Sequence, residues 1–319
     1  MKKIVCLSTN PAALSFETAT FAARSDSEFI ISGARTKADV KAAVSDADVV
    51  LFSDIAIDRE VIDSLKNCKL IIRYGIGYDN VDAKYAAAKG IFVCNAPNYG
   101  VTDVAEHALS LLLSCAKRLT YMNDCVRDGM WDTSKMGASR RLAGKTIGFI
   151  GFGKIAKCVC ERTNAFGLKA IVYDPYVTEE AAAAYRAEKV TLEELLPRAD
   201  YVTLHLPLNE QTRHMMGAAQ FAQMKPDAVF VNTSRGGLVN EKELIDALEN
   251  GTIAGAGLDV FEDESGNIDP RILHMKQVTL TPHVAWNTIE GAAALHEEVT
   301  NNVLRFLDGN RPESIVNGL

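Results

Sequence analysis

The chain has no cluster of basic residues, and this absence argues against a nucleic-acid partner. Lysine and arginine together number 34 against 41 aspartate and glutamate residues, so the formal net charge is −7. A negative overall field does not attract phosphate groups, and small anionic ligands would have to be bound by local groups instead. The composition therefore predicts that an anionic ligand is bound by groups in individual loops and not by a broad positively charged surface.

Long apolar runs are also missing. No stretch approaches the ~20 apolar residues that a membrane span needs. The N-terminal Met-Lys-Lys-Ile-Val-Cys-Leu-Ser lacks the long apolar region of a secretory signal. We therefore expect no membrane partner and a cytoplasmic location. Internal repeats, low-complexity tracts and disordered linkers are absent as well.

Cysteines are too few and too scattered for a disulfide framework. The seven lie at positions 6, 68, 94, 115, 125, 158 and 160. An odd number in a chain of this length favours reduced thiols. Cys158 and Cys160 are two positions apart on a predicted helix and face different directions, so we expect neither a redox pair nor a metal site there.

What the chain does contain is a regular alternation of short apolar runs and helical patterns. With 319 residues, 48% apolar and 24% charged, it is long enough for about two domains of ordinary composition. The alternation predicts parallel sheets covered by helices. In the first hundred residues we expect a helix at 81–89 and strands at 3–7, 49–52, 70–73 and 92–94.

An almost continuous Ala/Leu run at 101–126 predicts one long buried helix, which is long enough to serve two-fold dimerisation. Thr191-Leu-Glu-Glu194 is typical of a capping box. A last amphipathic helix at 288–307 is expected to return to the first domain. Six further strands, which fit two mononucleotide-binding halves, are predicted at 146–150, 170–173, 201–204, 228–232, 253–258 and 278–280.

The stretch Thr146-Ile-Gly-Phe-Ile-Gly151-Phe-Gly153-Lys-Ile-Ala156 lies between a predicted strand and a predicted helix. Gly151 permits a tight turn, Gly153 lets the backbone approach a diphosphate, and Ala156 lets the helix pack closely on the strand. Asp174 ends the next strand, where its carboxylate can accept both ribose hydroxyls and would repel a 2′-phosphate. The motif therefore predicts a dinucleotide site that prefers NAD to NADP.

Three more predicted strand ends carry polar side chains, namely Arg235, Asp259 and His283. Taken alone, an arginine in a loop is more often a surface residue, and a single histidine is more often structural. However, ligands bind in the crevice at the carboxyl ends of the strands of an open α/β sheet. A guanidinium there can hold a carboxylate and polarise a ketone. The set suits hydride transfer to a 2-keto acid.

From about Leu70 onward these motifs resemble the D-isomer-specific 2-hydroxyacid dehydrogenase family. The resemblance implies that Arg235 binds the substrate's carboxylate and carbonyl and that His283 is the catalytic acid/base. It also implies that Glu264 is catalytic and pairs with His283, since a carboxylate stabilises the protonated ring that donates to the forming alkoxide. Family members commonly have proline after this glutamate; Ser265-Gly266 stands there in this chain and would loosen the loop.

The resemblance also implies the ligand contacts. Arg73-Tyr-Gly75-Ile-Gly77 resembles the family's substrate loop, whose N–H groups around Ile76 and Gly77 would bind the substrate's carboxylate, although these residues can equally form a tight strand–helix turn. Gly75, Ile76 and Gly77 are thus predicted to bind substrate with Arg235 and His283, and His107 is expected to be structural. The predicted cofactor contacts are Gly151, Gly153, Lys154, Ile155, Asp174, His205, Thr233, Ser234, Asp259, Trp286 and Thr102.

The expected architecture is α/β, with two doubly wound parallel-sheet domains. A Rossmann NAD domain at 101–286 is inserted into a flavodoxin-like substrate domain made of 1–100 plus 287–319. The expected activity is the NAD-dependent reduction of a small 2-keto acid to a D-2-hydroxy acid, by a homodimer and without a metal.

The sequence leaves the substrate open. Ser53-Asp54, after the strand 49–52, places an acid where it would repel phosphate, and Trp286 resembles a segment of some glycerate dehydrogenases. Hydroxypyruvate or glyoxylate is therefore favoured, with 3-phosphoglycerate dehydrogenase as an alternative of the same class. An NAD(H)-sensing binding protein without catalysis, as in the C-terminal-binding-protein branch, is an alternative of another class.

Overall fold

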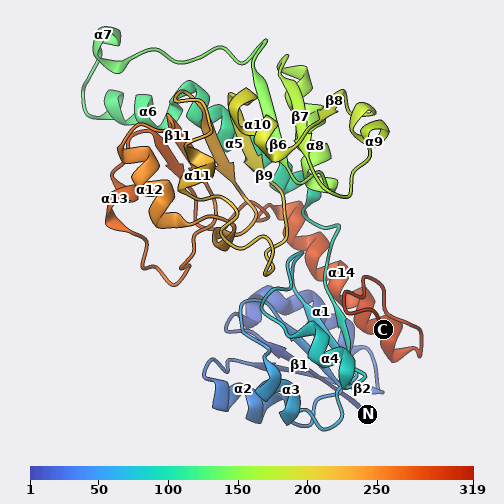
Figure 1. Cartoon of the computed structure of the whole chain (residues 1–319). Helices are drawn as coiled ribbons and strands as arrows, with labels where there is room; N and C mark the ends of the chain where they lie inside the picture. The colour runs from blue at the N-terminus through green and yellow to red at the C-terminus, as the bar shows by residue number, and fades with distance from the viewer. The chain divides into compact units, whose positions relative to one another are not determined.

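The computed structural model describes all 319 residues, and they form two compact units. Unit 1 consists of Met1–Gly100 and Thr288–Leu319, and unit 2 of Val101–Asn287. Each unit is built on one parallel sheet with helices around it (Figure 1). The predicted fold class, α/β with two doubly wound parallel sheets, is confirmed.

Unit 1 has five parallel strands in the order β2-β1-β3-β4-β5, which is the flavodoxin-like order. The strands are β1 (Lys2–Leu7), β2 (Ser27–Ser32), β3 (Val49–Phe52), β4 (Leu70–Arg73) and β5 (Phe92–Cys94). The helices are η1 (Pro11–Leu14), α1 (Ser15–Ala22), α2 (Lys37–Val44), α3 (Arg59–Ser64), α4 (Ala83–Ala88) and α14 (Ile289–Leu307).

The two faces of this sheet are covered by different helices. Alternate residues of β1, Val5 and Leu7, pack with the apolar residues of α2, α3 and α4 in one core cluster. Helix α14 packs on β4 and on α1, so that the C-terminal segment completes a domain that the N-terminal segment begins. Thr288 caps α14 by accepting a hydrogen bond from Gly291 N.

Unit 2 has seven parallel strands in the order β12-β11-β10-β9-β6-β7-β8, and this order reverses between β6 and β9. The strands are β6 (Thr146–Ile150), β7 (Lys169–Tyr173), β8 (Ala187–Lys189), β9 (Tyr201–Leu204), β10 (Val229–Asn232), β11 (Gly255–Leu258) and β12 (Val278–Leu280). The helices are α5 (Val101–Lys117), α6 (Leu119–Arg127), α7 (Thr133–Met136), α8 (Lys154–Ala165), α9 (Glu179–Ala183), α10 (Leu192–Arg198), α11 (Ala218–Phe221), η2 (Gly236–Leu238), α12 (Glu241–Glu249) and α13 (Pro270–Leu273).

The central strands of unit 2 are buried on both faces, as expected of a parallel sheet between two helical layers. Along β10, Phe230 packs with α10, α11 and α12 in one core cluster. Its neighbours Val229 and Val231 pack on the opposite face, with α5 and α8. Thr191 opens α10 with the predicted capping box.

Strands β2 and β8 are not predicted by the sequence analysis, and unit 2 has seven strands rather than the expected six. Each lies at one edge of its sheet, and the opposite edges are the predicted strands β5 and β12. Strand β8 reads only Ala-Glu-Lys, and edge strands are often short and polar. Strand β2 reads Ser-Glu-Phe-Ile-Ile-Ser and is only partly buried, although three of its residues are apolar.

The predicted single helix at 101–126 is wrong, because it is broken between α5 and α6. Arg118 adopts a left-handed conformation with φ of 53°. Its guanidinium donates to Met136 O at 2.6 Å and lies over the ring of Tyr121. None of the helices, α5 included, combines the length and the hydropathy needed to cross a membrane.

Candidate functional site

The tight turn after β6 depends on Gly151, which has φ of +88°. A Cβ atom at this position would lie 2.4 Å from the carbonyl oxygen of His205. The backbone N–H of Gly151 donates to Tyr173 O at 2.8 Å. The turn therefore packs against the chain at the ends of β7 and β9, and no residue larger than glycine fits at position 151.

The start of α8 is open in the way that a diphosphate site requires. Gly153 is the N-cap residue, no side chain caps the helix, and a Cβ atom at Gly153 would meet nothing within 4 Å. The first turn of a helix presents N–H groups and the positive end of its dipole to an anion. Lys154 and Ile155 lie in this turn, and Ala156 is fully buried against the sheet.

The half-buried carboxylate of Asp174, at the end of β7, is held in place by two backbone groups. Oδ2 accepts from Phe152 N and Oδ1 from Tyr176 N, each at 2.8 Å. An ionised carboxylate offers about four lone-pair sites. Each oxygen thus keeps capacity to accept a ribose hydroxyl.

A buried asparagine organises the loop after β10. Asn232 Nδ2 donates to Arg235 O, and Asn232 Oδ1 accepts from Ser234 N, both at 2.9 Å. Ser234 Oγ donates to Leu204 O at 2.8 Å, and Arg235 Nη1 donates to Ser234 O at 2.9 Å. Thr233 Oγ1 is buried and has no hydrogen-bond partner. The orphaned hydroxyl of Thr233, together with the open start of α8, fits a site built for a polar cofactor.

Gly236 lets the loop after β10 touch the loop after β11. A Cβ atom at Gly236 would lie 1.9 Å from the carbonyl carbon of Phe261 and 2.5 Å from Glu262 N. This backbone-to-backbone contact places the loop that carries Arg235 beside the acidic segment after β11.

The carboxylate of Asp259 has no exposed surface, and it accepts hydrogen bonds from the loop after β12. Oδ1 accepts from Thr281 Oγ1 at 2.6 Å and Val284 N at 3.0 Å, and Oδ2 accepts from Ala285 N at 2.9 Å. Burial raises the pKa of this carboxyl, but hydrogen bonds from His107, Thr281 and the loop amides outweigh burial, so that the pKa lies below its usual value. Asp259 thus stays ionised and fixes the segment that carries His283.

His283 and Glu264 are in contact. His283 Nδ1 lies 2.7 Å from Glu264 Oε2, the two side chains are 33% and 41% exposed, and Nε2 is the ring nitrogen that remains. His283 has φ of 53°, and its N–H donates to Asp259 O at 2.8 Å. Arg235, Glu264 and His283 follow β10, β11 and β12, which are consecutive in the sheet.

The Glu264 loop is braced without a proline. Ser265 N donates to Asp263 Oδ1 at 2.9 Å, and Asn267 Nδ2 contacts Asp263 Oδ2 at 3.3 Å. Before it, Glu262 N donates to Glu241 Oε2 at 2.9 Å and Glu241 N to Glu262 Oε2 at 3.2 Å. The side chain of His214 also contacts Glu262. The expected loosening by Ser265-Gly266 is therefore countered by these bonds.

The remaining predicted cofactor residues lie at the same edge of unit 2 or on α5. His205 follows β9, with Nε2 3.0 Å from Thr203 Oγ1. Trp286 directly follows Ala285, which is bonded to Asp259. Thr102 is exposed in the first turn of α5, the helix whose His107 Nε2 lies 2.9 Å from Thr281 Oγ1.

In unit 1 the loop Gly75–Gly77 is a tight turn after β4. Gly75 has φ of +129°. Its carbonyl accepts from Ala96 N at 3.0 Å, and the carbonyl of Ile76 accepts from Asn95 Nδ2 at 2.7 Å. The N–H groups of Ile76 and Gly77 make no hydrogen bond within the chain. The expected tight turn is present, and the substrate contact of this loop stays a prediction.

Asp54 does not present an unpaired charge at the end of β3. Its Oδ2 lies 2.7 Å from Arg35 Nη1, and Arg35 Nη2 also donates to Thr9 Oγ1 at 3.0 Å. A neighbouring guanidinium thus offsets the Asp54 carboxylate, and the expected repulsion of a substrate phosphate stays a prediction.

Two residues of the site, Asn232 and Thr281, were missed by sequence reasoning. Asn232 bonds Ser234 N and Arg235 O within its own loop, whereas Thr281 bonds Asp259, which follows β11. His107, which the sequence predicts to be structural, lies 2.9 Å from Thr281 Oγ1.

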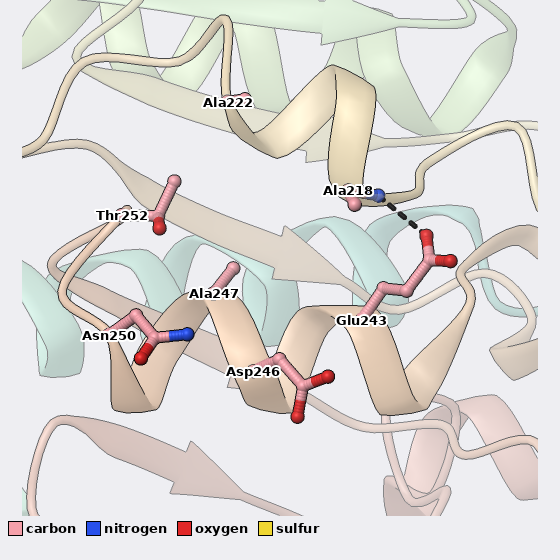
Figure 2. A pocket seen from close by; sticks show the side chains of 7 residues that line it. All are labelled: Ala218, Ala222, Glu243, Asp246, Ala247, Asn250 and Thr252. Carbon is pink, nitrogen blue, oxygen red and sulfur yellow. Dashed lines mark hydrogen bonds between the residues drawn. The ribbon is translucent and has the colours of Figure 1, made fainter.

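A separate surface pocket lies between α11 and α12, with a volume of about 170 Å³. Figure 2 shows Glu243 in it, bonded to Ala218 N at 2.6 Å. Its Asp246 is paired with Arg271 at 2.9 Å. The pocket contains none of the predicted site residues, and its acids are already bonded.

Comparison with known proteins gives a family match for unit 2. Residues 109–285 match the sequence profile described as "D-isomer specific 2-hydroxyacid dehydrogenase, NAD binding domain". The part of the chain matched contains the glycine turn, Asp174 and all three strand-end residues.

Similar proteins cover most of the chain. It is 38% identical over 278 residues to a glyoxylate reductase of Thermococcus litoralis, covering 85% of this chain and 83% of that protein. It is 40% identical over 284 residues to a D-3-phosphoglycerate dehydrogenase of Methanocaldococcus jannaschii, covering 88% of this chain but 54% of that protein, so it spans about half of the latter's length. The structure of a D-lactate dehydrogenase from Aquifex aeolicus with NAD and lactic acid matches with a TM-score of 0.88 at 27% identity, covering 96% of each chain.

Proposed function

Because the chain belongs to the D-isomer specific 2-hydroxyacid dehydrogenase family of oxidoreductases, we propose that it reduces a small 2-keto acid to the D-2-hydroxy acid. The observation that carries this proposal is the contact between His283 Nδ1 and Glu264 Oε2 at 2.7 Å. It lies at the sheet edge that also carries Arg235 and the dinucleotide turn.

We propose that unit 2 is the NAD-binding domain and unit 1 the substrate domain, as the sequence analysis expects. The start of α8, from Gly153, would hold the diphosphate, Asp174 the adenosine ribose, and Thr233 a polar group of the cofactor. The loop after β12 and Trp286 would border the nicotinamide. NAD is favoured over NADP because the Asp174 carboxylate would repel a 2′-phosphate.

The chain's own residues account for binding and proton transfer. Arg235 would grip the substrate's carboxylate and polarise its carbonyl with a rigid pair of donors. Glu264 holds Nδ1 of His283, so that Nε2 is the atom that would pass a proton to the carbonyl oxygen. The chemistry that NADH supplies when bound is hydride transfer to the carbonyl carbon.

We favour an unphosphorylated substrate such as glyoxylate or hydroxypyruvate. The relative named glyoxylate reductase, of which the chain covers 83%, supports this choice. The second candidate is 3-phosphoglycerate dehydrogenase activity, which the similarity to a relative of that name supports. The Arg35–Asp54 pair leaves that candidate open.

We also propose a homodimer. Large apolar side chains are exposed on α6 and the segment after it, namely Leu119, Val126, Met130 and Trp131, the last 87% exposed. In Figure 1, α7 and the loops on either side of it extend away from the sheet of their own unit, whereas α6 lies beside it. Exposed apolar patches of this kind favour a protein–protein contact.

The test is to incubate the protein with NADH and, in turn, glyoxylate, hydroxypyruvate and 3-phosphohydroxypyruvate, and to follow NADH absorbance. We expect turnover of the first two, and His283→Ala to lower kcat by about 10²–10⁴-fold without weakening NADH binding. His274→Ala, at an exposed histidine, is the control. Tight NADH binding without turnover of any keto acid would instead support the NAD(H)-sensing alternative.

A further inference from the structure

Unit 1 contains a buried acid that the proposed reaction does not use. Glu17 of α1 has no exposed surface. Its Oε1 accepts from the hydroxyl of Tyr74 at 2.8 Å and lies 2.6 Å from His296 Nδ1 on α14. Three segments far apart in the sequence thus meet at one carboxylate oxygen.

Stability alone does not explain this cluster. Burying a carboxylate is costly, and replacing a buried ion pair with apolar side chains is often neutral or stabilising. Glu17 Oε2 is moreover buried without a hydrogen-bond partner. Burial and the nearby Glu17 raise the pKa of the Cys6 thiol to about 12, so Cys6 stays protonated. Because burying the Glu17 carboxylate costs stability, we attribute the network to the conformation that it fixes in the residues bonded to it.

Tyr74 links this network to the Gly75–Gly77 loop, because it is the residue directly before it. Its N–H donates to Phe52 O at 2.7 Å, and its ring lies 5.6 Å from the ring of His296. The next carbonyl, that of Gly75, is held by Ala96 N at 3.0 Å. Tyr74 is therefore held at both its backbone and its hydroxyl, so the residue directly before the Gly75–Gly77 loop has a fixed position.

We propose that Glu17 and His296 are positioning residues that hold Tyr74 and thereby preset the Gly75–Gly77 loop for an anionic substrate. With the loop's carbonyls tied down, the N–H groups of Ile76 and Gly77 are kept available for a carboxylate. The assignment of a substrate to this loop rests on the proposed function. The positioning itself does not, and it can be measured without turnover.

The experiment compares Tyr74→Phe and Glu17→Gln with the wild-type chain. Tyr74→Phe keeps the ring and removes only the donor to Glu17. The matched control is Tyr85→Phe, which removes another tyrosine–carboxylate bond of unit 1, from Tyr85 to Asp63 at 2.8 Å. Amide hydrogen exchange at Ala96, whose N–H is bonded to Gly75 O, measures how firmly the Gly75–Gly77 loop is held. Steady-state kinetics with glyoxylate give KM and kcat, and a titration with NADH gives the Kd for the cofactor.

We expect Tyr74→Phe and Glu17→Gln to speed exchange at Ala96 and to raise the KM for the keto acid, each about 10-fold, because a hydrogen bond to a charged group is lost. The kcat should change little and the Kd for NADH not at all. Tyr85→Phe should leave all four values unchanged.

A lower Tm in both variants with unchanged exchange at Ala96 and unchanged KM would overturn the proposal, since the network would then only stabilise the fold. If the wild-type chain reduces no 2-keto acid, the proposed function fails, and the exchange measurement still decides whether the network positions the loop.

Discussion

The Asp174 carboxylate binds the backbone of Phe152 on one side and of Tyr176 on the other, each at 2.8 Å. This double anchorage means that its negative charge has a fixed place beside the glycine turn. A fixed charge discriminates between cofactors better than a mobile one, because it cannot move away from a 2′-phosphate.

We therefore expect Asp174→Asn, which keeps one acceptor oxygen and loses the charge, to raise the KM for NADH about 10-fold and to lower that for NADPH. Initial rates with each cofactor at saturating glyoxylate measure this. Glu179→Gln, at an exposed acid of α9, is the control. An unchanged NADH-to-NADPH preference in Asp174→Asn would contradict the assignment.

His205 links the site to stability. Burial lowers the pKa of His205 to about 3 from its ordinary value of 6.5. The unfolded chain takes up this proton near pH 6.5 and the folded chain does not, so stability is complete above that pH and is lost as the pH falls below it. We expect the free energy of unfolding to drop by about 1–2 kcal/mol between pH 7 and pH 5 from this residue.

Urea unfolding of the apo protein at several pH values measures the drop. His205→Gln should flatten the curve in this range, whereas His274→Gln should follow the wild type, since His274 is exposed. Identical slopes for wild type and His205→Gln would show that His205 is protonated in the folded chain.

Single residues were predictable where local geometry or charge dictated them. Gly151 is required by its positive φ, and Asp174 by its place after the second strand of the nucleotide motif. Asn232 and Thr281 were not, because the sequence shows neither the fold of the loop that Asn232 holds together nor that Thr281 lies beside Asp259. The fully buried carboxylate of Asp259 shows the same limit, since its bonds to Thr281, Val284 and Ala285 are tertiary. Its cofactor contact stays a prediction.

Between elements, the contact of Gly236 with the Phe261 backbone is the most restrictive feature of unit 2. A methyl group there, 1.9 Å from a backbone carbon, would push the Arg235 loop away from the Glu264 loop. We expect Gly236→Ala to lower the free energy of unfolding by about 1–3 kcal/mol and to reduce kcat/KM more than 10-fold.

The adjacent Gly237→Ala is a matched control, because its Cβ would meet side-chain atoms and no backbone atom, the nearest being Leu208 Cδ2 at 3.0 Å. Chemical unfolding and keto-acid kinetics measure both variants. Equal effects at the two positions would show that the loop tolerates displacement and that the backbone contact is not what aligns it.

Strands were predictable from sequence where they contain mostly apolar residues between polar ones. Strands β3, β4, β5, β6, β9 and β12 begin and end at the expected residues. Strand β8 has no apolar run, and β2 was missed although it contains Phe29-Ile30-Ile31. The break at Arg118 has no glycine or proline to mark it, and it depends on the distant carbonyl of Met136.

For the whole molecule, the exposed apolar segment of unit 2 predicts self-association. We expect light scattering after size-exclusion chromatography to give twice the mass of one chain. The double variant Val126→Ser with Trp131→Ser should give a monomer, because it removes two exposed apolar side chains of this segment. Phe166→Ser, at an exposed phenylalanine elsewhere on unit 2, should stay dimeric. A monomeric wild type would refute the proposal.

The interruption of unit 1 by unit 2 has a consequence for synthesis on the ribosome. At about 5–20 residues per second, Val101–Asn287 takes roughly 10–40 s to emerge. During that time Glu17 has no His296 to meet and one face of the first sheet lacks α14. Pulse proteolysis of a released chain truncated after Asn287 should find the N-terminal segment cleavable while unit 2 resists. The domain that is begun first is thus completed last, and Glu17 has only Tyr74 as a partner until the final helix is made.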